Sequence, residues 1–437
     1  MARNSSRRWF LESGLAALGG LTLPELMRLQ HLSAAENAGA SKGKAVILFW
    51  LSGGPSQLDM WDPKPDAPTE IRGPYGSIAT ALPGVRFCEH LPMQASIADR
   101  LSVIRSVDCS ASNHTPITMQ AGNPLARRTN DGRDGGGYPS MGSVAAKFRG
   151  PNDPDLPAFV GLAHSWTSDV WEAGHMGSAF APVKGAELKG RFGLPQGIEV
   201  DRLKARQKIR RQIDQFGKTI DNDQTLARTD RFTQQAYDLV LSGKVQRAFA
   251  VEEESAETRA AYGPESIAQK ALLARRLVEA GVTFVLVSGA WGYFDHHGDQ
   301  VRWGGIEKGL TPLLPRVDRV MHALVTDLEQ RGLLDDTLVM MMGEFGRSPV
   351  INKDAGRDHW TNVMSMIMAG GGFNHGQVIG STDRRGGSIE SSSVRPQDLA
   401  ATTFRHLGID LNAHWTNNQG RPIPIVAEGG RPIPELG

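Results

Sequence analysis

Apolar runs that end abruptly in glycine-rich or polar loops recur along this chain. The first, at residues 45–51, contains no polar side chain and stops at Ser52-Gly53-Gly54-Pro55. Such a run is typical of a strand buried on both faces, as in a parallel sheet. Similar patterns predict strands at 101–107, 282–287, 337–342 and 363–368, and helices at 266–280 and 313–331. The alternation predicts a doubly wound α/β fold, a mostly parallel sheet flanked by helices.

Charge and cysteine content exclude several classes of protein. The 437 residues include 48 Lys+Arg and 47 Asp+Glu, a net charge of +1, so nothing favours nucleic acid or an anionic membrane as a partner. Two cysteines, Cys88 and Cys109, are too few for a disulfide scaffold or a Cys-rich zinc site. A single bridge between them and two buried free thiols both remain open.

The N-terminal segment has the order of an export signal. Ser6-Arg7-Arg8-Trp9-Phe10-Leu11 precedes a mildly apolar run and then Ala38-Gly39-Ala40, which resembles a twin-arginine (Tat) signal. The alternative is a short amphipathic helix with a chance arginine pair. We expect a signal peptide at 1–40, an extracytoplasmic (periplasmic or secreted) protein, Tat export machinery as a partner and no stable membrane span after cleavage.

The remaining chain, residues 41–437, is predicted to form a single α/β domain. The charged stretch at about 200–260 is expected to be a helical insertion or cap, and 417–437 an irregular tail rich in proline and glycine.

Metal-ligand side chains cluster in the loops beside the predicted strands, where ligands of open α/β sheets bind. The candidate ligands are Asp59, Asp295, His297, Glu344, Asp358 and His359. Carboxylate and imidazole together suit a divalent metal, zinc first and otherwise manganese, iron, calcium or magnesium, as one or two ions. A structural hydrogen bond is the alternative for each Asp-His pair taken alone.

The candidate nucleophile, Ser112, lies between strand 101–107 and a predicted helix that reaches Gly122. Ser112 at that helix N-terminus would meet backbone N–H donors that favour an anionic transition state. The alternative is that Ser112 is an ordinary N-cap residue of this helix and that His114 is exposed in its first turn.

These residues carry a resemblance to the alkaline phosphatase and sulfatase superfamily, and more closely to an exported bacterial family, domain of unknown function 1501. The closer resemblance covers most of the chain. It rests on Gly53-Gly54-Pro55-Ser56 with Asp59 and Asp62-Pro63-Lys64-Pro65, on residues 295–299, on Gly343-Glu344-Phe345-Gly346-Arg347 and on Gly356-Arg357-Asp358-His359-Trp360.

The resemblance implies an exported metal-dependent hydrolase of phosphate or sulfate esters, of small-molecule or polysaccharide type. Asp295, His297 and His359 would hold one metal, with Glu344 and Asp59 contributing to it or to a second. Ser112 or a bound water would be the nucleophile, and Arg347 or His114 would neutralise developing charge.

Departures from the superfamily pattern keep a second interpretation open. Ser52-Gly53-Gly54 stands where a metal-bridging Asp is expected, and Phe345 replaces an imidazole. The sulfatase pattern Cys-x-Pro-x-Arg is absent, which argues against formylglycine chemistry. The alternative is an exported non-catalytic binding or scaffold protein that retains the fold.

Overall fold

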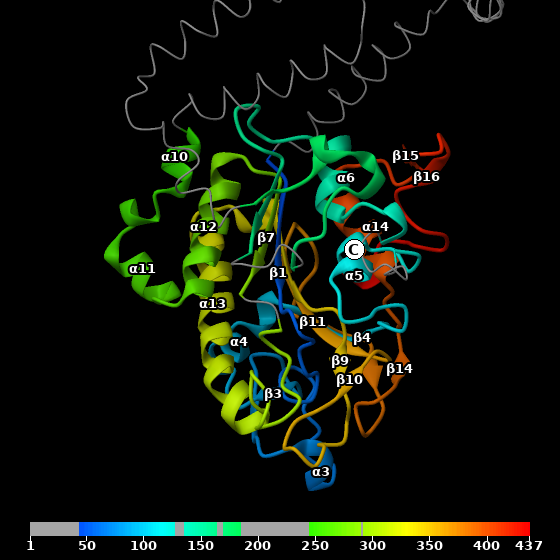
Figure 1. Ribbon diagram of the computed structural model, residues 1–437. Helices are drawn as coiled ribbons and strands as arrows, with labels where there is room; N and C mark the ends of the chain where they lie inside the picture. The colour runs from blue at the N-terminus through cyan, green and yellow to red at the C-terminus, as the bar shows by residue number, and fades with distance from the viewer. Residues whose placement is uncertain (1–42, 127–134, 164–168, 185–243, 290–291) are drawn as a thin grey trace, which may run out of the picture. The chain divides into compact units, whose positions relative to one another are not determined.

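The computed structural model describes residues 43–126, 135–163, 169–184, 244–289 and 292–437. Its centre is an eight-stranded sheet of order β12-β4-β11-β8-β1-β7-β5-β6 (Figure 1). The strands are β1 (Ala45–Trp50), β4 (Ser102–Val107), β5 (Phe159–Leu162), β6 (Val183–Lys184), β7 (Phe284–Ser288), β8 (Thr337–Met342), β11 (Met364–Gly370) and β12 (Gln377–Ile379). Every neighbouring pair is parallel except the two pairs that β11 makes, with β4 and with β8.

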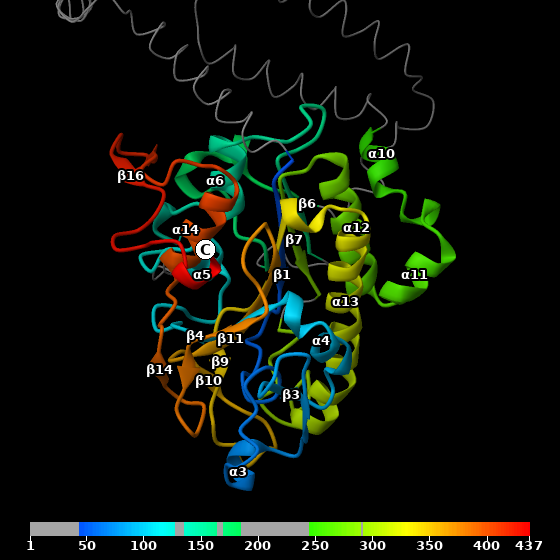
Figure 2. The ribbon, with the colours of Figure 1, turned by 180° about the vertical axis from the view of Figure 1, so that it is seen from behind.

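Helices cover both faces of this sheet, which confirms the predicted doubly wound α/β class. One face carries α4 (Pro92–Ser96), α12 (Ser266–Ala280) and α13 (Thr311–Gln330), and the other carries α5 (Ile117–Ala121), α6 (Met141–Phe148) and α14 (Pro396–His406) (Figures 1 and 2). Strand β1 shows why two layers are needed. Its residues Ile47 and Phe49 join one hydrophobic core and Leu48 and Trp50 the other, all at most 1% exposed.

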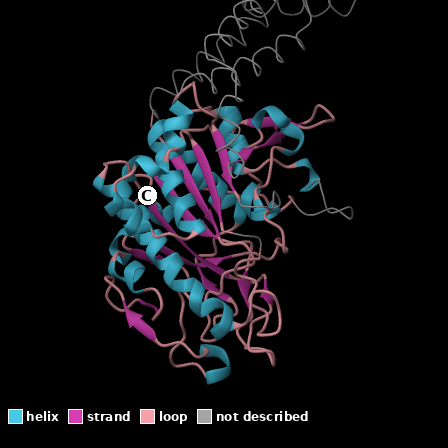
Figure 3. Cartoon of the chain, turned by 60° about the vertical axis from the view of Figure 1, so that its left-hand side comes forward, coloured by secondary structure: helices cyan, strands magenta, loops and turns pink. Residues whose placement is uncertain are grey.

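Smaller elements surround the sheet (Figure 3). Three further helices are α3 (Thr69–Arg72), α10 (Lys244–Phe249) and α11 (Ala256–Tyr262). Four two-stranded ladders pair β2 (Ser77–Ala79) with β3 (Arg86–Cys88), β9 (Gly346–Arg347) with β10 (His359–Trp360), β13 (Ser381–Thr382) with β14 (Ile389–Ser391), and β15 (His414–Thr416) with β16 (Pro422–Pro424). The tail expected to be irregular therefore contributes one short strand, β16.

Helix α5 differs from its expected position. It begins at Ile117 with Pro116 as its N-cap residue, so Ser112 lies in the preceding loop and caps nothing. Proline disfavours helical backbone at the residue before it, which explains why the helix does not extend back through Thr115. The C-terminal end is as expected, with Gly122 in the left-handed conformation.

Two expectations fall wholly or partly outside the described residues: the signal peptide at 1–40, and residues 200–243 of the helical insertion expected at about 200–260. No helix among the residues that the structure describes is long and apolar enough to cross a membrane.

Candidate metal centre

The reversed strand β11 explains how the candidate residues meet at one edge of the sheet. The loops after β1, β4, β7 and β8 leave the carboxyl ends of parallel strands. Because β11 runs antiparallel to β4 and β8, the segment that enters it lies at that same edge. His359, five residues before β11, therefore approaches the loops that carry His114, Asp295 and Glu344.

Three ligand atoms converge to form the centre. Asp295 Oδ1 lies 3.0 Å from His297 Nε2 and 3.0 Å from His359 Nε2, and the two ring nitrogens are 2.8 Å apart. His114, Asp295 and His359 also place ligand atoms within 4.8 Å of one another. These side chains are partly exposed, 17% for Asp295 and 32% for both His297 and His359, so an ion from solvent has access.

The donor set fits a divalent metal. Adjacent ligands of an ion bound at about 2.0–2.1 Å lie roughly 3 Å apart, which matches the three separations. At most one of the two facing imidazole nitrogens carries the hydrogen between them, so at least one presents a lone pair. One carboxylate oxygen and two imidazoles are a ligand set typical of zinc and of neighbouring transition metals.

Arg347 orients the central carboxylate. Its Nη2 donates to Asp295 Oδ1 at 2.7 Å, and His359 stands directly opposite Arg347 in the β9–β10 ladder. The guanidinium also donates to backbone carbonyls: Nε to Gly54 at 3.0 Å, Nη1 to Arg357 at 2.8 Å, and Nη2 to Phe294 at 3.0 Å and to Gly53. Since Arg347 is 2% exposed and each of its three guanidinium nitrogens already donates to the protein, it positions Asp295 rather than meeting a substrate.

The pKa of Asp295 reflects this setting. Burial raises the pKa of Asp295, but hydrogen bonds from His114, His359 and Arg347 outweigh burial and hold it well below its usual value. The carboxylate is therefore charged at any physiological pH, as a metal ligand must be.

Glycines let the backbone of the first loop approach the centre. Gly53 and Gly54 have φ of +108° and +88°, a region that favours glycine. A Cβ on Gly53 would stand 2.5 Å from the amide nitrogen of Asp295, and one on Gly54 2.5 Å from the Phe345 ring. Their carbonyls can therefore reach Arg347, which a side chain at either position would prevent.

His114 links Asp295 to a second, buried carboxylate. Its Nδ1 lies 3.1 Å from Glu344 Oε1 and its Nε2 lies 3.4 Å from Asp295 Oδ2. Burial lowers the pKa of His114, but the bonds to Asp295 and Glu344 outweigh burial and raise it to about 9. Glu344 Oε1 also accepts from the Gly53 amide at 2.8 Å, while Glu344 Oε2 is buried and has no hydrogen-bond partner among the described residues. An unsatisfied buried carboxylate oxygen suits a site that holds a cation.

Two of the expected ligands lie elsewhere. Asp59 is 1% exposed and forms a bidentate pair with Arg357, at 2.7 and 3.0 Å, so Arg357 occupies both of its oxygens. Asp358 is 65% exposed and lies 3.5 Å from His297 Nδ1, the ring nitrogen that faces away from the three-atom cluster. At that position Asp358 can orient the His297 imidazole.

Ser112 is not brought to the cluster by any contact in the described residues. Its hydroxyl hydrogen bonds only to the Asn113 carbonyl, at 3.4 Å.

Sequence reasoning missed a buried network behind the centre. Asp169 accepts hydrogen bonds from Ser52 at 2.8 Å and from Ser288 at 2.7 Å, and the Ser52 hydroxyl accepts from the Gly292 amide. Burial raises the pKa of Asp169 to about 6. The available signal was the pair of serines at the ends of two apolar runs, Ser52 just after β1 and Ser288 at the end of β7, because a buried polar residue needs a partner.

Comparison with solved structures finds similar folds at low identity. Ps i-CgsB has a TM-score of 0.40 at 13% identity, covering 84% of this chain and 72% of its own. The lipoteichoic acid synthase LtaP from Listeria monocytogenes has 0.39 at 11%, covering 86% and 78%. A sulfatase from Pseudoalteromonas sp. has 0.36 at 14%, covering 89% and 72%. No residue role follows from likeness this distant.

No curated protein matches the chain. A family model described as "Protein of unknown function (DUF1501)" matches residues 43–436, nearly the whole chain. The expected family is therefore confirmed: the chain belongs to the DUF1501 family.

Proposed function

We propose that the protein is a metal-dependent hydrolase of phosphate or sulfate esters. The observation that carries the proposal is the convergence of Asp295 Oδ1, His297 Nε2 and His359 Nε2 to within 2.8–3.0 Å of one another at the carboxyl edge of the sheet. The twin-arginine pattern at the N-terminus extends the proposal to an exported enzyme.

When bound, a divalent ion at these three atoms would supply Lewis-acid polarisation of the ester oxygen and an acidified water. The chain's own residues do the rest. Arg347 fixes the orientation of Asp295, and Asp358 faces the outer nitrogen of His297. His114 stands at the rim between Glu344 and Asp295, where it can hold a proton or meet an anionic oxygen. Zinc suits two imidazoles and one carboxylate best. Water is the simplest nucleophile, because in the part of the chain that the structure describes Ser112 makes no contact with the cluster.

One observation favours the second candidate, a non-catalytic binding or scaffold protein. Asp295 Oδ1 already lies near three nitrogen groups, those of Arg347, His297 and His359, which together form a network that is satisfied without an ion. The loop after β1 presents Gly53 and Gly54 where a second carboxylate ligand would complete a two-metal site.

Metal content and ester hydrolysis, measured on the same preparation, test the proposal. We expect the full chain, exported by its own signal and purified without chelator, to carry one or two equivalents of zinc or another divalent ion. It should hydrolyse 4-nitrophenyl phosphate or 4-nitrophenyl sulfate. His359→Ala should lose the ion and lower kcat/KM by more than about 100-fold, since even residues that only support metal ligands cost 10–100-fold. His414→Ala, at an exposed position on β15, is the matched control.

Each outcome separates the two candidates. A folded protein that takes up no metal on titration would overturn the hydrolase. A protein that binds metal through His359 but hydrolyses no phosphate or sulfate ester would favour the non-catalytic binding protein.

A further inference from the structure

A small cavity adjoins the metal-binding loop that follows β7 but is lined by none of its ligands. In this loop, Asp295 and His297 both contact His359. The alternate residues Phe294 and His296 pack together instead, with ring centroids 6.2 Å apart. His296 lines the cavity, together with Tyr293 and residues between 302 and 316, which lead into α13. The cavity is therefore a site separate from the ligand cluster.

The size of the cavity limits what it can hold. Its volume is about 180 Å³. That is below the ~300–1,000 Å³ of sites that bind drug-sized molecules. It is still several times the roughly 30 Å³ that one water molecule occupies in the liquid. The space therefore suits a small ion rather than an organic cofactor or a polymer.

The charge of the lining favours an anion. Arg302, Lys308 and Arg316 line the cavity, and among the described residues no carboxylate does. Lys308 is paired with Asp299, at 2.9 Å. Arg302 lies over the Trp303 ring, with Cζ 4.7 Å from the ring centroid, and Arg316 makes a 3.5 Å hydrogen bond to a tyrosine hydroxyl. Neither arginine forms an ion pair in the part of the chain that the structure describes, so two positive charges are left uncompensated.

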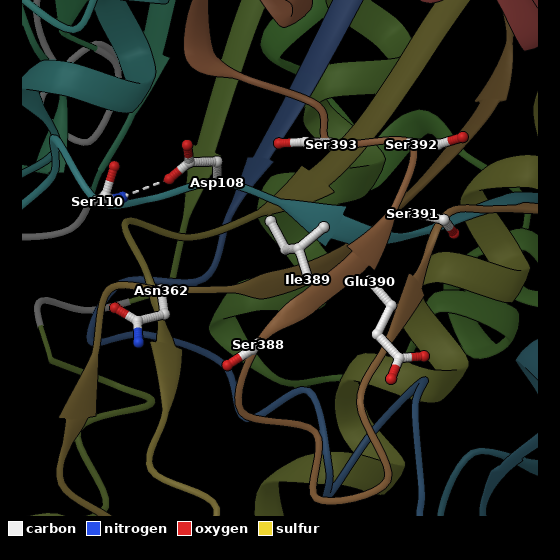
Figure 4. A pocket seen from close by; sticks show the side chains of 9 residues that line it. All are labelled: Asp108, Ser110, Asn362, Ser388, Ile389, Glu390, Ser391, Ser392 and Ser393. Atoms are coloured by element: carbon white, nitrogen blue, oxygen red, sulfur yellow. Dashed lines mark hydrogen bonds between the residues drawn. The ribbon is translucent and has the colours of Figure 1, made fainter.

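A larger cavity, of about 610 Å³, has the opposite charge. The charged side chains that line it are Asp108, in the loop after β4, and Glu390, on β14 (Figure 4). Two carboxylates repel an anion, whereas two unpaired arginines attract one. Of these two cavities, the one beside His296 is therefore the candidate anion site.

A buried imidazole without a partner narrows the choice of anion. His296 is 6% exposed, and its Nε2 has no hydrogen-bond partner among the described residues. Its Nδ1 lies 3.0 Å from the Trp303 carbonyl, which can only accept, so Nδ1 carries a hydrogen. When the ring is neutral, Nε2 therefore has a lone pair that lacks a donor. Trp303 Nε1 is also buried without a partner, and it needs an acceptor.

The backbone beside the cavity leaves room for this imidazole. Ile306–Leu310 forms a π-helical turn before α13, a rare conformation that is frequent at functional sites. Gly309 in this turn lies against the ring, and a Cβ there would stand 2.5 Å from His296 Nδ1. A side chain at position 309 would therefore displace His296 from the cavity wall.

We propose that this cavity binds inorganic phosphate as its monohydrogen ion. Its two negative charges suit the two arginines, and its oxygens accept from guanidinium and indole N–H groups. Its one hydroxyl hydrogen can be donated to His296 Nε2. Sulfate carries the same charge but has no hydrogen to donate. The inference does not depend on the proposed hydrolase, because the site needs neither metal nor turnover.

Calorimetry on the full chain at pH 8 tests the proposal, with chelator present so that no bound metal offers a second anion site. An imidazole with its ordinary pKa of about 6.5 is neutral at this pH. Three dianions are compared: inorganic phosphate, sulfate and methyl phosphate, which is fully ionised and has no hydrogen to donate. We expect saturable binding of inorganic phosphate. Sulfate and methyl phosphate should bind roughly five- to tenfold more weakly, the loss expected for one hydrogen bond.

Variants locate the site. Arg302→Gln and Arg316→Gln, both at exposed positions where the fold is expected to tolerate the change, should each weaken phosphate binding roughly tenfold. Arg259→Gln removes the same charge at an exposed position on α11. It is the matched control and should leave the affinity unchanged.

Four results would overturn the inference: no saturable binding of phosphate, an affinity that neither cavity variant lowers, an affinity that Arg259→Gln lowers equally, or equal affinity for the three dianions. Failure of the proposed hydrolase would look different. In that case phosphate would bind with the expected preferences, while the protein took up no metal and hydrolysed no ester.

Discussion

At the scale of single residues, Asp295 is the point where separate parts of the chain meet. Its Oδ1 atom is within 3.0 Å of nitrogens from Arg347, His297 and His359. The sequence predicted Asp295, His297 and His359 as metal ligands because they lie in loops directly beside predicted strands. The sequence could not reveal that the Arg347 guanidinium would donate to the Gly53 and Gly54 carbonyls, because those bonds depend on the conformation of two glycines nearly 300 residues away.

The protonation of His114 predicts how the stability of the metal-free protein depends on pH. Its pKa is raised to about 9 in the folded state, from 6.5 in the unfolded chain, because hydrogen bonds to Asp295 and Glu344 outweigh burial. A raised pKa gives stability that is full below pH 6.5 and is lost as the pH rises through about 9. After chelator treatment, the free energy of unfolding measured in urea at pH 6 should therefore be higher for wild type than for His114→Asn. The difference between the two proteins should be smaller at pH 9.5.

Titrating groups that do not contact His114 are common to both proteins and cancel in that difference. A gap between wild type and His114→Asn that stays constant from pH 6 to pH 9.5 would show that the ion pairs of His114 do not form.

At the scale of elements, the sequence predicted what is local and missed what is not. Helix α12 spans Ser266–Ala280 as expected, because its periodicity and the terminating Gly281 are encoded within sixteen residues. The direction of β11 depends on pairing with β4 and β8 and is invisible in its own apolar run. Likewise, the sequence predicted Asp59 as a metal ligand because it does not reveal the ion-pair partner of Asp59, Arg357, which lies 298 residues further on.

The pair of Asp59 and Arg357 predicts an effect on stability and none on metal binding. Both side chains are 1% exposed, and Arg357 also donates to the Ile71 carbonyl at 2.8 Å, which joins the loop after β1 to the loop before β10. Removing one partner of a buried ion pair costs about 3–5 kcal/mol. Asp59→Asn should therefore lower the free energy of unfolding by up to that amount, measured in urea, while the metal content stays that of wild type.

A double variant provides the control. Asp59→Leu with Arg357→Met removes both charges and should recover part of the loss, because replacing a whole buried pair by apolar side chains is often neutral. Loss of metal from a folded Asp59→Asn protein would instead indicate that Asp59 is a metal ligand.

At the scale of the whole molecule, the sheet separates two hydrophobic cores, and this decides the state of the cysteines. Cys88 packs in the core that contains Ile47 and Phe49, while Cys109 packs in the core that contains Leu48 and Trp50. Both are free thiols. The sequence left open a disulfide or two buried free thiols, and the structure has the buried free thiols. No local pattern around either cysteine indicates which face of the sheet it occupies.

The position of the two thiols on opposite faces predicts their chemistry. Cys88 is 1% exposed and Cys109 is 0% exposed, and burial raises the pKa of the Cys88 thiol to about 12 and that of Cys109 well above its usual value. Since the thiolate is the reactive form, neither should react with Ellman's reagent in the native protein, and two thiols per chain should react in denaturant without reductant. We expect this also for protein recovered from an oxidising compartment, because a bridge requires Cα atoms within about 7 Å and the sheet stands between them. A chain that shows no thiol in denaturant, with a mass lower by two hydrogens, would contradict the separation of the two cores.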